Sequence, residues 1–533
     1  MRTISNAALG VIVSLAIALP VAAQPGPSQA ELNAADQQGA NWLYATHDYT
    51  GQRFVDLNQI TPQNVKNLRP VAIFQASELG PVQTNPLVYD GVMYLTTAHT
   101  VVALDAATAH RKWEYVWKPK DKENYNTNRG VAIKDGLVVR GTPDGYLIAL
   151  DAATGELRWE RQIAHYDQGE FISAPPLIVN DRIIIGPAGS DWAAKGWVGA
   201  FKLADGTPLW KFNTVPDPGE PGAKTWGKDT SVLMHGGGNI WTPMSYDRAT
   251  GLVYVGVGNP GPGLYDNLRP GANLYTCAMV ALDVNSGKLK WYYQAVPHDV
   301  HDWDLTQVSP LFTTTVGGAR RDLIAVAGKD GLLHVLDRKT HALLYTVPFT
   351  RRENVDVPLD TVGVHVFPGP TGGEEWSGPA YNRVTDLLYV PSVEHGAVYK
   401  KAASLTPPTG KDMYIGGTFA LDTGDVARGS LSAFDAATGK QRWVYKSETP
   451  MLAGVCTTSG GLVFTGEHGK DFMALDARTG EVLYRFNTGG PVGAGVISYS
   501  VNGKQYVAAV SGFVSGGFRN IGGGTATVVI FSL

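Results

Sequence analysis

The sequence contains few cysteines and few charged residues. Its 533 residues include only Cys277 and Cys456, and Asp, Glu, Lys and Arg together make up 17% of the chain. Each cysteine lies within an apolar, strand-like stretch, so two free buried thiols are favoured over a disulfide, although an exported chain could form one. No Cys-X-X-Cys-His motif occurs, which excludes a covalently attached c-type haem.

Basic residues are not concentrated anywhere along the chain. The 44 basic and 48 acidic side chains give a formal net charge of −4, and no run of Lys or Arg is present. Proteins that bind nucleic acids generally use clustered positive charge to contact the phosphates. A nucleic acid is therefore not an expected partner.

Only one apolar run is long enough to suggest export or a membrane. It follows Arg2 and ends with three small residues just before Gln24. A basic start, a short apolar core and a small-residue end are typical of a cleaved secretory signal. An uncleaved membrane anchor is the alternative, but the run is short for a bilayer and Pro20 interrupts it. We predict a signal peptide over residues 1–23 and a mature chain of 24–533.

One short pattern recurs seven times with a fixed spacing, and we call it the Asp–aromatic repeat. Its first residue, usually Asp, lies eight positions before a Trp or Tyr, and an apolar alternating run precedes it. The copies start at Asp105, Asp151, Lys202, Asp283, Asp337, Asp435 and Asp476 and end at Trp113, Trp159, Trp210, Trp291, Tyr345, Trp443 and Tyr484. The pattern predicts strand, tight turn, strand, because Asp can bond its own turn and the Gly found in most copies allows positive φ.

A period of about 40–50 residues with four-stranded units predicts a β-propeller. Eight strand pairs can be counted, with the first full repeat beginning near Pro70. We therefore expect an all-β fold in which residues 24–533 form a single domain of eight four-stranded antiparallel blades. The N-terminal and C-terminal segments should pair, because closing the ring removes the open sheet edge.

The densest group of titratable residues is the segment PHDVHDWD, residues 297–304. Three carboxylates this close repel one another unless a cation or a proton compensates. In an extended chain Asp302 and Asp304 point to the same side. Such a pair suits a hard cation, with one carboxylate left as a general base. Taken alone, the segment is equally compatible with acids that cap turns at the edge of a blade.

Two further polar residues follow strands at corresponding positions of different blades. They are Asp191, after the strand IIIGPAG, and Asn259, after YVGVG. Corresponding positions converge on the axis of a propeller, so both side chains could meet Asp302 and Asp304. For Asn259 alone, ordinary turn chemistry is the favoured interpretation.

Three larger side chains lie near strand starts. Trp241 follows a glycine run and could form the floor of a site for a planar ligand, or fill the core of a blade. Arg129 and Lys329 are cations that would each, taken alone, be interpreted as solvated surface charges. The residues themselves do not decide between these alternatives.

Several long motifs together carry a family resemblance. They are NWLYATHDYTGQRF with ITPQNVKNL, VGVGNPGPG with RPG, KLKWYYQAVPHDVHDWDL and GGLVFTGEHGKDFMALDARTGEVLYRF. With these motifs the chain closely resembles the pyrroloquinoline-quinone (PQQ)-dependent dehydrogenases, which are eight-bladed quinoproteins, over nearly the whole mature sequence. The resemblance implies a periplasmic enzyme that oxidises an alcohol, aldehyde or sugar hydroxyl by hydride transfer to PQQ, with metal assistance.

The resemblance also implies roles for individual residues. Asp302 matches the catalytic general base, and Lys329 matches the catalytic cation beside the reactive quinone oxygens. The implied cofactor-binding residues are Gln83, Arg129, Ser173, Trp241 and Lys329. The implied ligands of a Ca²⁺ or lanthanide ion are Asp191, Asn259, Asp302 and Asp304.

The chain departs from the family pattern at three places. Glu123 and Asn124 stand where many members carry two adjacent cysteines, Asp191 replaces the usual Glu, and Glu375 stands where Asn is common. The acidic segment is more similar to the glucose dehydrogenase version than to the methanol version. Within the family, an Asp at the position of Asp304 is associated with lanthanide use, so a lanthanide is slightly favoured over Ca²⁺. Substrate and metal stay open.

Without haem in this chain, electrons would leave the enzyme to a separate carrier such as cytochrome c or a membrane quinone.

Two other functions compete with the enzyme interpretation. A non-catalytic propeller scaffold of the outer-membrane assembly type shares the repeats but needs no cofactor, and an inactive quinoprotein homologue is the third possibility. The enzyme is favoured, because a scaffold has no use for the polar residues implied at the site.

Overall fold

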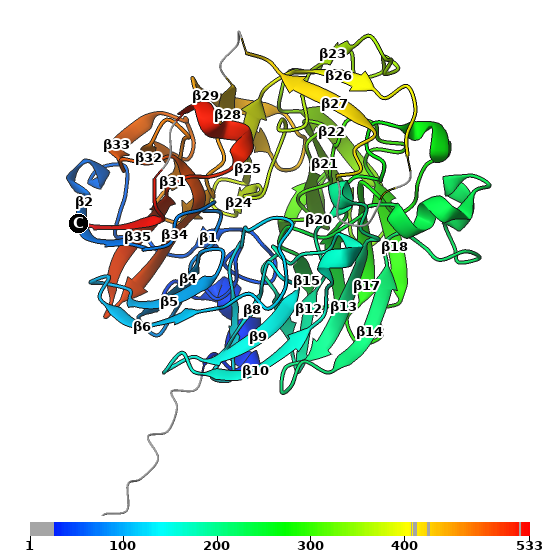
Figure 1. Ribbon diagram of the computed structural model, residues 1–533. Coiled ribbons are helices and arrows are strands. Elements are labelled where there is room, and N and C mark those ends of the chain that lie inside the picture. Colours follow the sequence, from blue (N-terminus) through cyan, green and yellow to red (C-terminus); the bar gives the residue numbers. More distant parts are fainter. Residues whose placement is uncertain (1–25, 407, 409–412, 424–426, 522–523) are drawn as a thin grey trace, which may run out of the picture.

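The chain is built almost wholly from β-strands, whose sheets are arranged around a common centre (Figure 1). The structure is a computed structural model that describes residues 26–533 except 407, 409–412, 424–426 and 522–523. The predicted signal segment, residues 1–23, lies outside the described residues. The predicted all-β propeller of four-stranded antiparallel blades is confirmed.

Among the described residues, seven sheets contain four antiparallel strands each. Five of these sheets consist of four consecutive strands: β3 Leu87–Tyr89, β4 Val92–Thr96, β5 Thr100–Asp105 and β6 Arg111–Val116; β7 Ala132–Lys134, β8 Leu137–Gly141, β9 Tyr146–Asp151 and β10 Leu157–Gln162; β11 Leu177–Val179, β12 Arg182–Ile185, β13 Trp197–Lys202 and β14 Pro208–Asn213; β15 Ser245–Asp247, β16 Leu252–Gly256, β17 Ala278–Asp283 and β18 Leu289–Gln294; and β19 Leu311–Val316, β20 Ala319–Ala327, β21 Leu332–Asp337 and β22 Leu343–Pro348. A sixth sheet contains β24 Ala380–Asn382, β25 Leu387–Glu394, β28 Arg428–Asp435 and β29 Gln441–Ser447. The seventh combines β2 Arg69–Gln75 with β34 Val492–Val501, β35 Lys504–Ser511 and β36 Thr527–Ser532.

An eighth sheet has the same four-stranded antiparallel core and one added strand. Its core strands are β30 Cys456–Thr458, β31 Leu462–Gly466, β32 Asp471–Asp476 and β33 Val482–Asn487, and β1 Phe54–Val55 pairs with β30 in parallel. A three-stranded sheet, β23 Val364–Val366, β26 Ala397–Lys401 and β27 Gly417–Leu421, lies outside the ring (Figure 1). The short helices are α1 Gln29–Asn33, η1 Ala35–Gln37, η2 Val65–Asn67, η3 Tyr166–Gln168, η4 Ser190–Trp192, η5 Ala223–Trp226, η6 Thr230–His235, η7 Asp266–Leu268 and η8 Gly516–Ile521.

Both ends of the described chain contribute to one sheet. Strand β2 pairs antiparallel with β36, giving the order β2-β36-β35-β34, and the C-terminus lies beside β2 in Figure 1. Pro70 lies in β2, so the expectation that the first repeat begins there is wrong. This segment completes the C-terminal sheet, and the first sheet of consecutive strands begins at Leu87.

Each Asp–aromatic repeat connects the third and fourth strands of a sheet. Between β5 and β6, for example, Oδ1 of Asp105 accepts the backbone N–H of Ala107 at 3.1 Å and of Thr108 at 2.9 Å. The two strands then pair with a register shift between Ala103 and Leu104. The local turn chemistry expected from the sequence is therefore present.

The aromatic residue of the repeat also joins neighbouring blades. Trp113 donates its indole N–H to the carbonyl of Ala152, in the repeat of the next blade, at 3.0 Å. Equivalent indole bonds run from Trp159 to the carbonyl of Leu203, from Trp210 to that of Val284 and from Trp443 to that of Ala477. Tyr345 donates its hydroxyl to the carbonyl of Ala436 in the same way. The constant spacing of the repeat thus reflects packing between blades as well as the turn within one.

Glycine is required where the aromatic ring meets the next repeat, and this gives a stability prediction. A Cβ built on Gly155 would lie 2.6 Å from the ring of Trp113, and its φ is +76°. Gly251 has a similar φ, +70°, but open space around it. We expect Gly251→Ala to lower the free energy of unfolding by about 1 kcal/mol through backbone strain alone. Gly155→Ala should cost about 1–3 kcal/mol more, because the ring must move.

Urea unfolding of the two variants checks this prediction. The difference between their midpoints isolates the contact with Trp113, because the backbone strain is similar at both positions. Equal midpoints would contradict the role given to the interblade contact.

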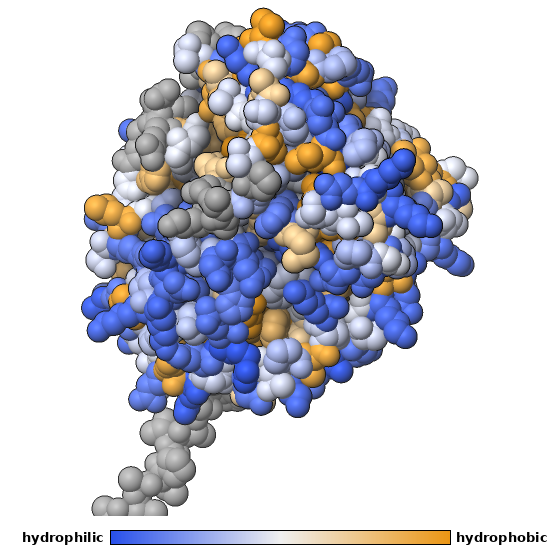
Figure 2. Space-filling model, turned by 45° about the vertical axis from the view of Figure 1, so that its right-hand side comes forward, coloured by the Kyte–Doolittle hydropathy of each residue, from blue (hydrophilic) through white to orange (hydrophobic). Residues whose placement is uncertain are grey.

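The remaining sequence expectations concern cysteines and membrane segments. Cys277 and Cys456 are both free and buried, as favoured from the sequence. In the part of the chain that the structure describes, no helix is long and apolar enough to cross a membrane. On the face shown in Figure 2, polar side chains predominate and apolar ones are scattered among them.

Candidate active site

A cavity of about 380 Å³ brings together all nine residues singled out from the sequence. They are Gln83, Arg129, Ser173, Asp191, Trp241, Asn259, Asp302, Asp304 and Lys329. Each lies in a connection just before the first strand of a blade or just after the second. Corresponding ends of different blades meet at the centre of the ring, which is why residues distant in sequence share one cavity.

One side of the cavity combines a buried cation with a flat ring. The guanidinium of Arg129 lies 4.6 Å from the centre of the Trp241 ring. Its Nη1 donates to Oγ of Ser173 at 2.8 Å and to the carbonyl of Trp241 at 3.0 Å. Burial lowers the pKa of Arg129 to about 10, so it stays charged near neutral pH. This arrangement can bind an anionic group beside a planar ligand.

Two polar atoms on this side have no partner within the protein. Nε of Arg129 and Oε1 of Gln83 are buried without a hydrogen bond, whereas Nε2 of Gln83 donates to the carbonyl of Val514 at 3.1 Å. Buried polar groups in native proteins are nearly always paired. Unpaired atoms facing a cavity therefore indicate that a polar ligand belongs there.

The same ring also has a lysine near it, held between two carboxylates, because Nζ of Lys329 lies 5.6 Å from the centre of the Trp241 ring. Nζ of Lys329 lies 3.3 Å from Oδ2 of Asp302 and 2.7 Å from Oδ2 of Asp304. Burial alone would lower the pKa of Lys329, but the charges of these carboxylates hold it well above its ordinary value. Lys329 is therefore a permanent positive charge in the cavity.

The backbone at Asp302 differs from the extended chain expected from the sequence. Its φ is +62°, in the left-handed region, so alternation along a strand does not explain how Asp302 and Asp304 face one group. The carboxylate of Asp299 stabilises this turn by accepting the backbone N–H of His301 at 3.0 Å and of Trp303 at 3.1 Å. Both acids still reach Lys329, because the turn redirects the chain between them.

A single buried arginine holds this turn against the rest of the site. Arg269 donates to the carbonyls of Asp299 at 2.8 Å, Pro262 at 2.9 Å and Gly263 at 2.6 Å. It thereby joins the acidic segment to the loop that follows Asn259. The sequence analysis did not single out Arg269, because an arginine is ordinarily a surface residue.

The carboxylates of the cavity are held in an unfavourable environment for negative charge. Burial raises the pKa of Asp302 well above its ordinary value, and Oδ1 of Asp302 has no partner. Burial and the nearby charge of Asp304 also raise the pKa of Asp191. Burial raises the pKa of Glu375, a further residue lining the cavity, to about 7. A bound cation would stabilise these groups in their ionised forms.

The predicted metal ligands are in contact with one another. Nδ2 of Asn259 donates to Oδ1 of Asp191 at 3.0 Å, and its backbone N–H donates to Oδ1 of Asp304 at 2.8 Å. Gly258 permits this approach, because a Cβ there would lie 2.6 Å from that oxygen. Asp191 itself lies on the short helix η4 rather than at a strand end.

The described residues contain no group of three His, Cys, Asp or Glu side chains already arranged around a metal. Two contacts explain this: Lys329 occupies the space between Asp302 and Asp304, and Asn259 turns its amide nitrogen toward Asp191. The donor set is nevertheless one of carboxylate and amide oxygens, which suits a hard cation. These residues would fit such an ion once the Lys329 ammonium and the Asn259 amide nitrogen moved away from the carboxylates.

Aromatic side chains that the sequence analysis did not assign to the site form another wall. Tyr125 packs against Phe171, with ring centres 5.9 Å apart, and against Trp192 at 6.1 Å. All three line the cavity. Tyr125 lies in an ordinary polar stretch of the sequence, so only the fold reveals that the three rings form one wall. Tyr125 directly follows Glu123 and Asn124, where the chain departs from the family pattern.

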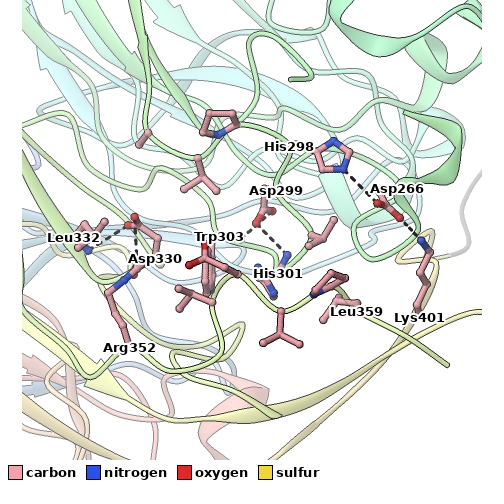
Figure 3. A pocket seen from close by; sticks show the side chains of 18 residues that line it. Asp266, His298, Asp299, His301, Trp303, Asp330, Leu332, Arg352, Leu359 and Lys401 are labelled. Carbon is pink, nitrogen blue, oxygen red and sulfur yellow. Dashed lines mark hydrogen bonds and ion pairs between the residues drawn. The ribbon is translucent and has the colours of Figure 1, made fainter. Parts of the chain in front are cut away.

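The reverse side of the acidic segment faces a second cavity of about 490 Å³ (Figure 3). Among its lining side chains, Asp266 contacts His298 and Lys401, and Asp330 contacts Arg352, while Nε2 of His301 is buried without a partner. The first cavity differs, because it alone of the two brings Arg129, Trp241 and the carboxylates around Lys329 together. We therefore assign the candidate active site to the first cavity.

Comparisons with known proteins identify the families that the chain resembles. Residues 42–362 match a family described as "Glucose/ethanol/alcohol dehydrogenase, beta-propeller domain", under the heading PQQ. Residues 427–513 match a family described as "Outer membrane protein assembly factor BamB". All nine site residues lie within the first matched region and none within the second.

Individual proteins match nearly the full chain. The quinohemoprotein alcohol dehydrogenase ADH IIB of Pseudomonas putida is 33% identical, with 96% of this chain and 79% of that protein aligned. The quinoprotein alcohol dehydrogenase PedH of Pseudomonas putida is 34% identical, over 87% of this chain and 84% of its own. The structure of a europium-containing methanol dehydrogenase, 27% identical, superimposes with a TM-score of 0.86 over 95% of this chain and all of the other.

Proposed function

Because this chain belongs to the PQQ-dependent dehydrogenase family, we propose that it oxidises the hydroxyl group of an alcohol, aldehyde or sugar with bound PQQ and a metal ion. The observation that supports the proposal is the convergence of the nine predicted residues on one cavity, which holds two cations, a flat ring and several carboxylates. A binding surface without chemistry would have no need for buried carboxyl groups with raised pKa values, such as those of Asp302 and Asp191.

The cofactor would be held by residues on the Arg129 side of the cavity. The ring of Trp241 offers a flat surface, Arg129 a positive charge, and Ser173 and Gln83 hydrogen-bonding groups. When bound, the quinone supplies the two-electron acceptor and the metal ion polarises it. The protein supplies orientation, and the aromatic wall of Tyr125, Phe171 and Trp192 excludes water.

Asp302 is the general base in this proposal. Lys329 holds its Oδ2 at 3.3 Å, which leaves the buried Oδ1 free to accept the proton of the substrate hydroxyl. The turn stabilised by Asp299 fixes the direction of the side chain. A base positioned in this way removes the proton as the alcohol carbon is oxidised.

The metal ion would bind to Asp191, Asn259, Asp302 and Asp304. Asp191 and Asn259 are already in contact, and both Asn259 and Lys329 contact Asp304. Three carboxylates favour an ion of high charge, so we propose a lanthanide with Ca²⁺ as the alternative. The fold shared with a europium-containing methanol dehydrogenase supports this choice.

The electron acceptor and the location follow from the sequence. The chain has no c-type haem motif, so we propose that electrons leave to a separate carrier such as cytochrome c or a membrane quinone. The secretory signal predicted for residues 1–23 supports a periplasmic protein whose mature domain comprises residues 24–533.

The scaffold function rests on one observation, the match of residues 427–513 to an outer-membrane assembly factor. That region consists of repeat strands and contains none of the nine residues of the cavity. The match therefore reflects the shared blade pattern. The nine cavity residues lie instead in the region that matches the dehydrogenase family, which favours the dehydrogenase over the scaffold. An inactive quinoprotein homologue would keep the cavity but show no turnover. A dye-linked activity assay distinguishes it from an active enzyme.

Arg129→Met tests the proposed function at the cofactor. Loss of a charge-assisted bond to a quinone carboxylate should weaken PQQ binding about 10- to 100-fold, measured by equilibrium titration at neutral pH. Dye-linked alcohol oxidation at limiting PQQ should fall in parallel. Arg442→Gln, which removes an exposed ion pair with Asp435, is the control and should change neither quantity. Equal PQQ affinity in wild type and Arg129→Met would contradict the assignment.

A further inference from the structure

Three side chains outside the cavity form a compact ionic cluster, which we call the Glu78–His99–Glu123 triad. Nδ1 of His99 lies 2.6 Å from Oε1 of Glu78, and its Nε2 lies 2.8 and 3.1 Å from the two carboxylate oxygens of Glu123. A neutral imidazole has only one N–H, so a ring with both nitrogens against carboxylates must carry two protons. The geometry therefore requires a positively charged His99.

The surroundings of the triad are consistent with that charge. Hydrogen bonds that His99 donates to the carboxylates of Glu123 and Glu78 raise its pKa to about 9. Burial would raise the pKa of Glu78, but its bonds from His99 and Thr97 lower it to about 2. Each of the three side chains is only about a fifth exposed, with values of 23% for His99, 19% for Glu78 and 18% for Glu123. Solvent therefore screens the triad only in part.

The triad sits at the tip of one hairpin, between two loops. His99 lies between β4 and β5, Glu78 in the loop after β2, and Glu123 in the loop after β6. Arg140 of β8 holds the hairpin by donating to the carbonyls of residues 97, 98 and 100. Asp144, whose charge also acts on Arg140, accepts the indole N–H of Trp117 at 2.8 Å.

Both loops continue from the triad directly into the candidate active site. Glu78 precedes Gln83 by five residues, and Glu123 precedes Arg129 by six. Tyr125, two residues after Glu123, packs in the aromatic wall of the cavity. The loops also meet beyond the triad, where the backbone N–H of Asn85 donates to the carbonyl of Arg129 at 3.1 Å.

We propose that Glu78, His99 and Glu123 are positioning residues that hold the loops 76–86 and 118–131 in the arrangement that binds the quinone. The proposal rests on the proposed function, because it concerns the affinity for PQQ. The triad joins the two loops through charge, with Glu78 in one loop, Glu123 in the other and His99 between them. Gln83, Tyr125 and Arg129 then enter the cavity from segments tied to each other.

The first test uses His99→Gln and Glu123→Gln. Each should weaken PQQ binding at about pH 7 by about tenfold, the scale expected for a lost charge-assisted hydrogen bond. The matched control is again Arg442→Gln, whose ion pair with Asp435 lies in a distant hairpin. A purely structural role would lower the melting temperature of a variant without changing the affinity of its folded form. Unchanged PQQ affinity in both variants would overturn the proposal.

The second test uses pH. The pKa of His99 is raised in the folded protein. Its ion pairs with Glu78 and Glu123 therefore stabilise the folded state fully at pH values below the ordinary histidine pKa of about 6.5, and this stabilisation is lost as the pH rises through about 9. Wild-type affinity for PQQ should therefore approach that of His99→Gln between about pH 8 and 10. A ratio of the two affinities that stays constant over this range would contradict the proposal.

A third measurement needs no cofactor and separates this proposal from the proposed function. Histidine NMR of the cofactor-free protein should show His99 titrating near pH 9. Amide hydrogen exchange in residues 118–131 should become faster in His99→Gln than in wild type. Wild-type protein that does not bind PQQ would overturn the proposed function and the effect on affinity, whereas an ordinary His99 titration with unchanged exchange would overturn the triad itself.

Discussion

Replacing Asp302 by Asn should lower turnover by about two orders of magnitude or more while leaving PQQ binding largely intact. The expected loss is the usual scale for removing a general base. Asn has nearly the same shape, so the Lys329 ammonium can still donate a hydrogen bond to the amide oxygen. Because the replacement leaves Lys329 in place beside the Trp241 ring, the groups proposed to bind the cofactor should be little disturbed. Single-turnover kinetics with saturating PQQ and metal measure the effect.

Glu375→Gln is the comparison that identifies the base. Glu375 lines the same cavity, and its pKa, raised by burial to about 7, would also suit a proton acceptor near neutral pH. We expect this variant to retain far more activity than Asp302→Asn, because the two carboxylates that Lys329 contacts are those of Asp302 and Asp304. The opposite order of activities would transfer the role of base to Glu375.

Replacing Asp304 by Asn should change which metal ion supports activity. The variant keeps an oxygen that can accept the backbone N–H of Asn259 but removes one negative charge from the site. A trivalent ion gains more from each surrounding charge than a divalent one. We therefore expect the affinity for La³⁺ to fall about 10- to 100-fold and that for Ca²⁺ to fall less. Metal titrations of the PQQ-loaded wild type and variant, under matched conditions, measure both.

The geometry around Lys329 makes this test informative. In the structure, Lys329 contacts Asp304 at 2.7 Å, so Asp304 has a structural partner even without a metal. Wild-type activity that is equal or greater with Ca²⁺, and unchanged in Asp304→Asn, would leave Asp304 as a structural acid paired with Lys329. The lanthanide proposal would then be wrong.

The fold was predictable because its repeat combines two constraints at a fixed spacing. Asp105 fixes a turn within one blade, and Trp113 reaches the repeat of the next blade at Ala152. Such a pattern survives wide variation elsewhere in the sequence. The start of the first repeat was placed wrongly, because the sequence around Pro70 shows that a strand is present but not which partner it pairs with.

The polar residues of the candidate site were predictable for a related reason. Asp191 and Asn259 follow the second strands of neighbouring blades, and the ring geometry brings corresponding ends together. The route by which Asp302 and Asp304 come together was not predictable. It depends on the positive φ of Asp302 and on the buried Arg269, which act through contacts between distant segments.

The remaining parts of the site could not be inferred from local pattern. Tyr125 belongs to a wall formed with Phe171 and Trp192, yet its sequence context is that of an ordinary polar loop. His99 lies at a hairpin tip, where a histidine is usually exposed, and its charge depends on carboxylates in two other loops. Interactions of this kind are determined by tertiary structure alone.

The central claim is that this cavity binds PQQ with a metal ion and oxidises alcohols or sugars. The most direct measurement is a titration of the purified protein with PQQ in the presence of either Ca²⁺ or a light lanthanide. It should be followed by absorption spectroscopy and a dye-linked assay with alcohols and sugars. The account predicts saturable binding with one PQQ per chain and dye reduction that depends on both the metal and a substrate. Absence of PQQ binding with every ion tested would contradict it.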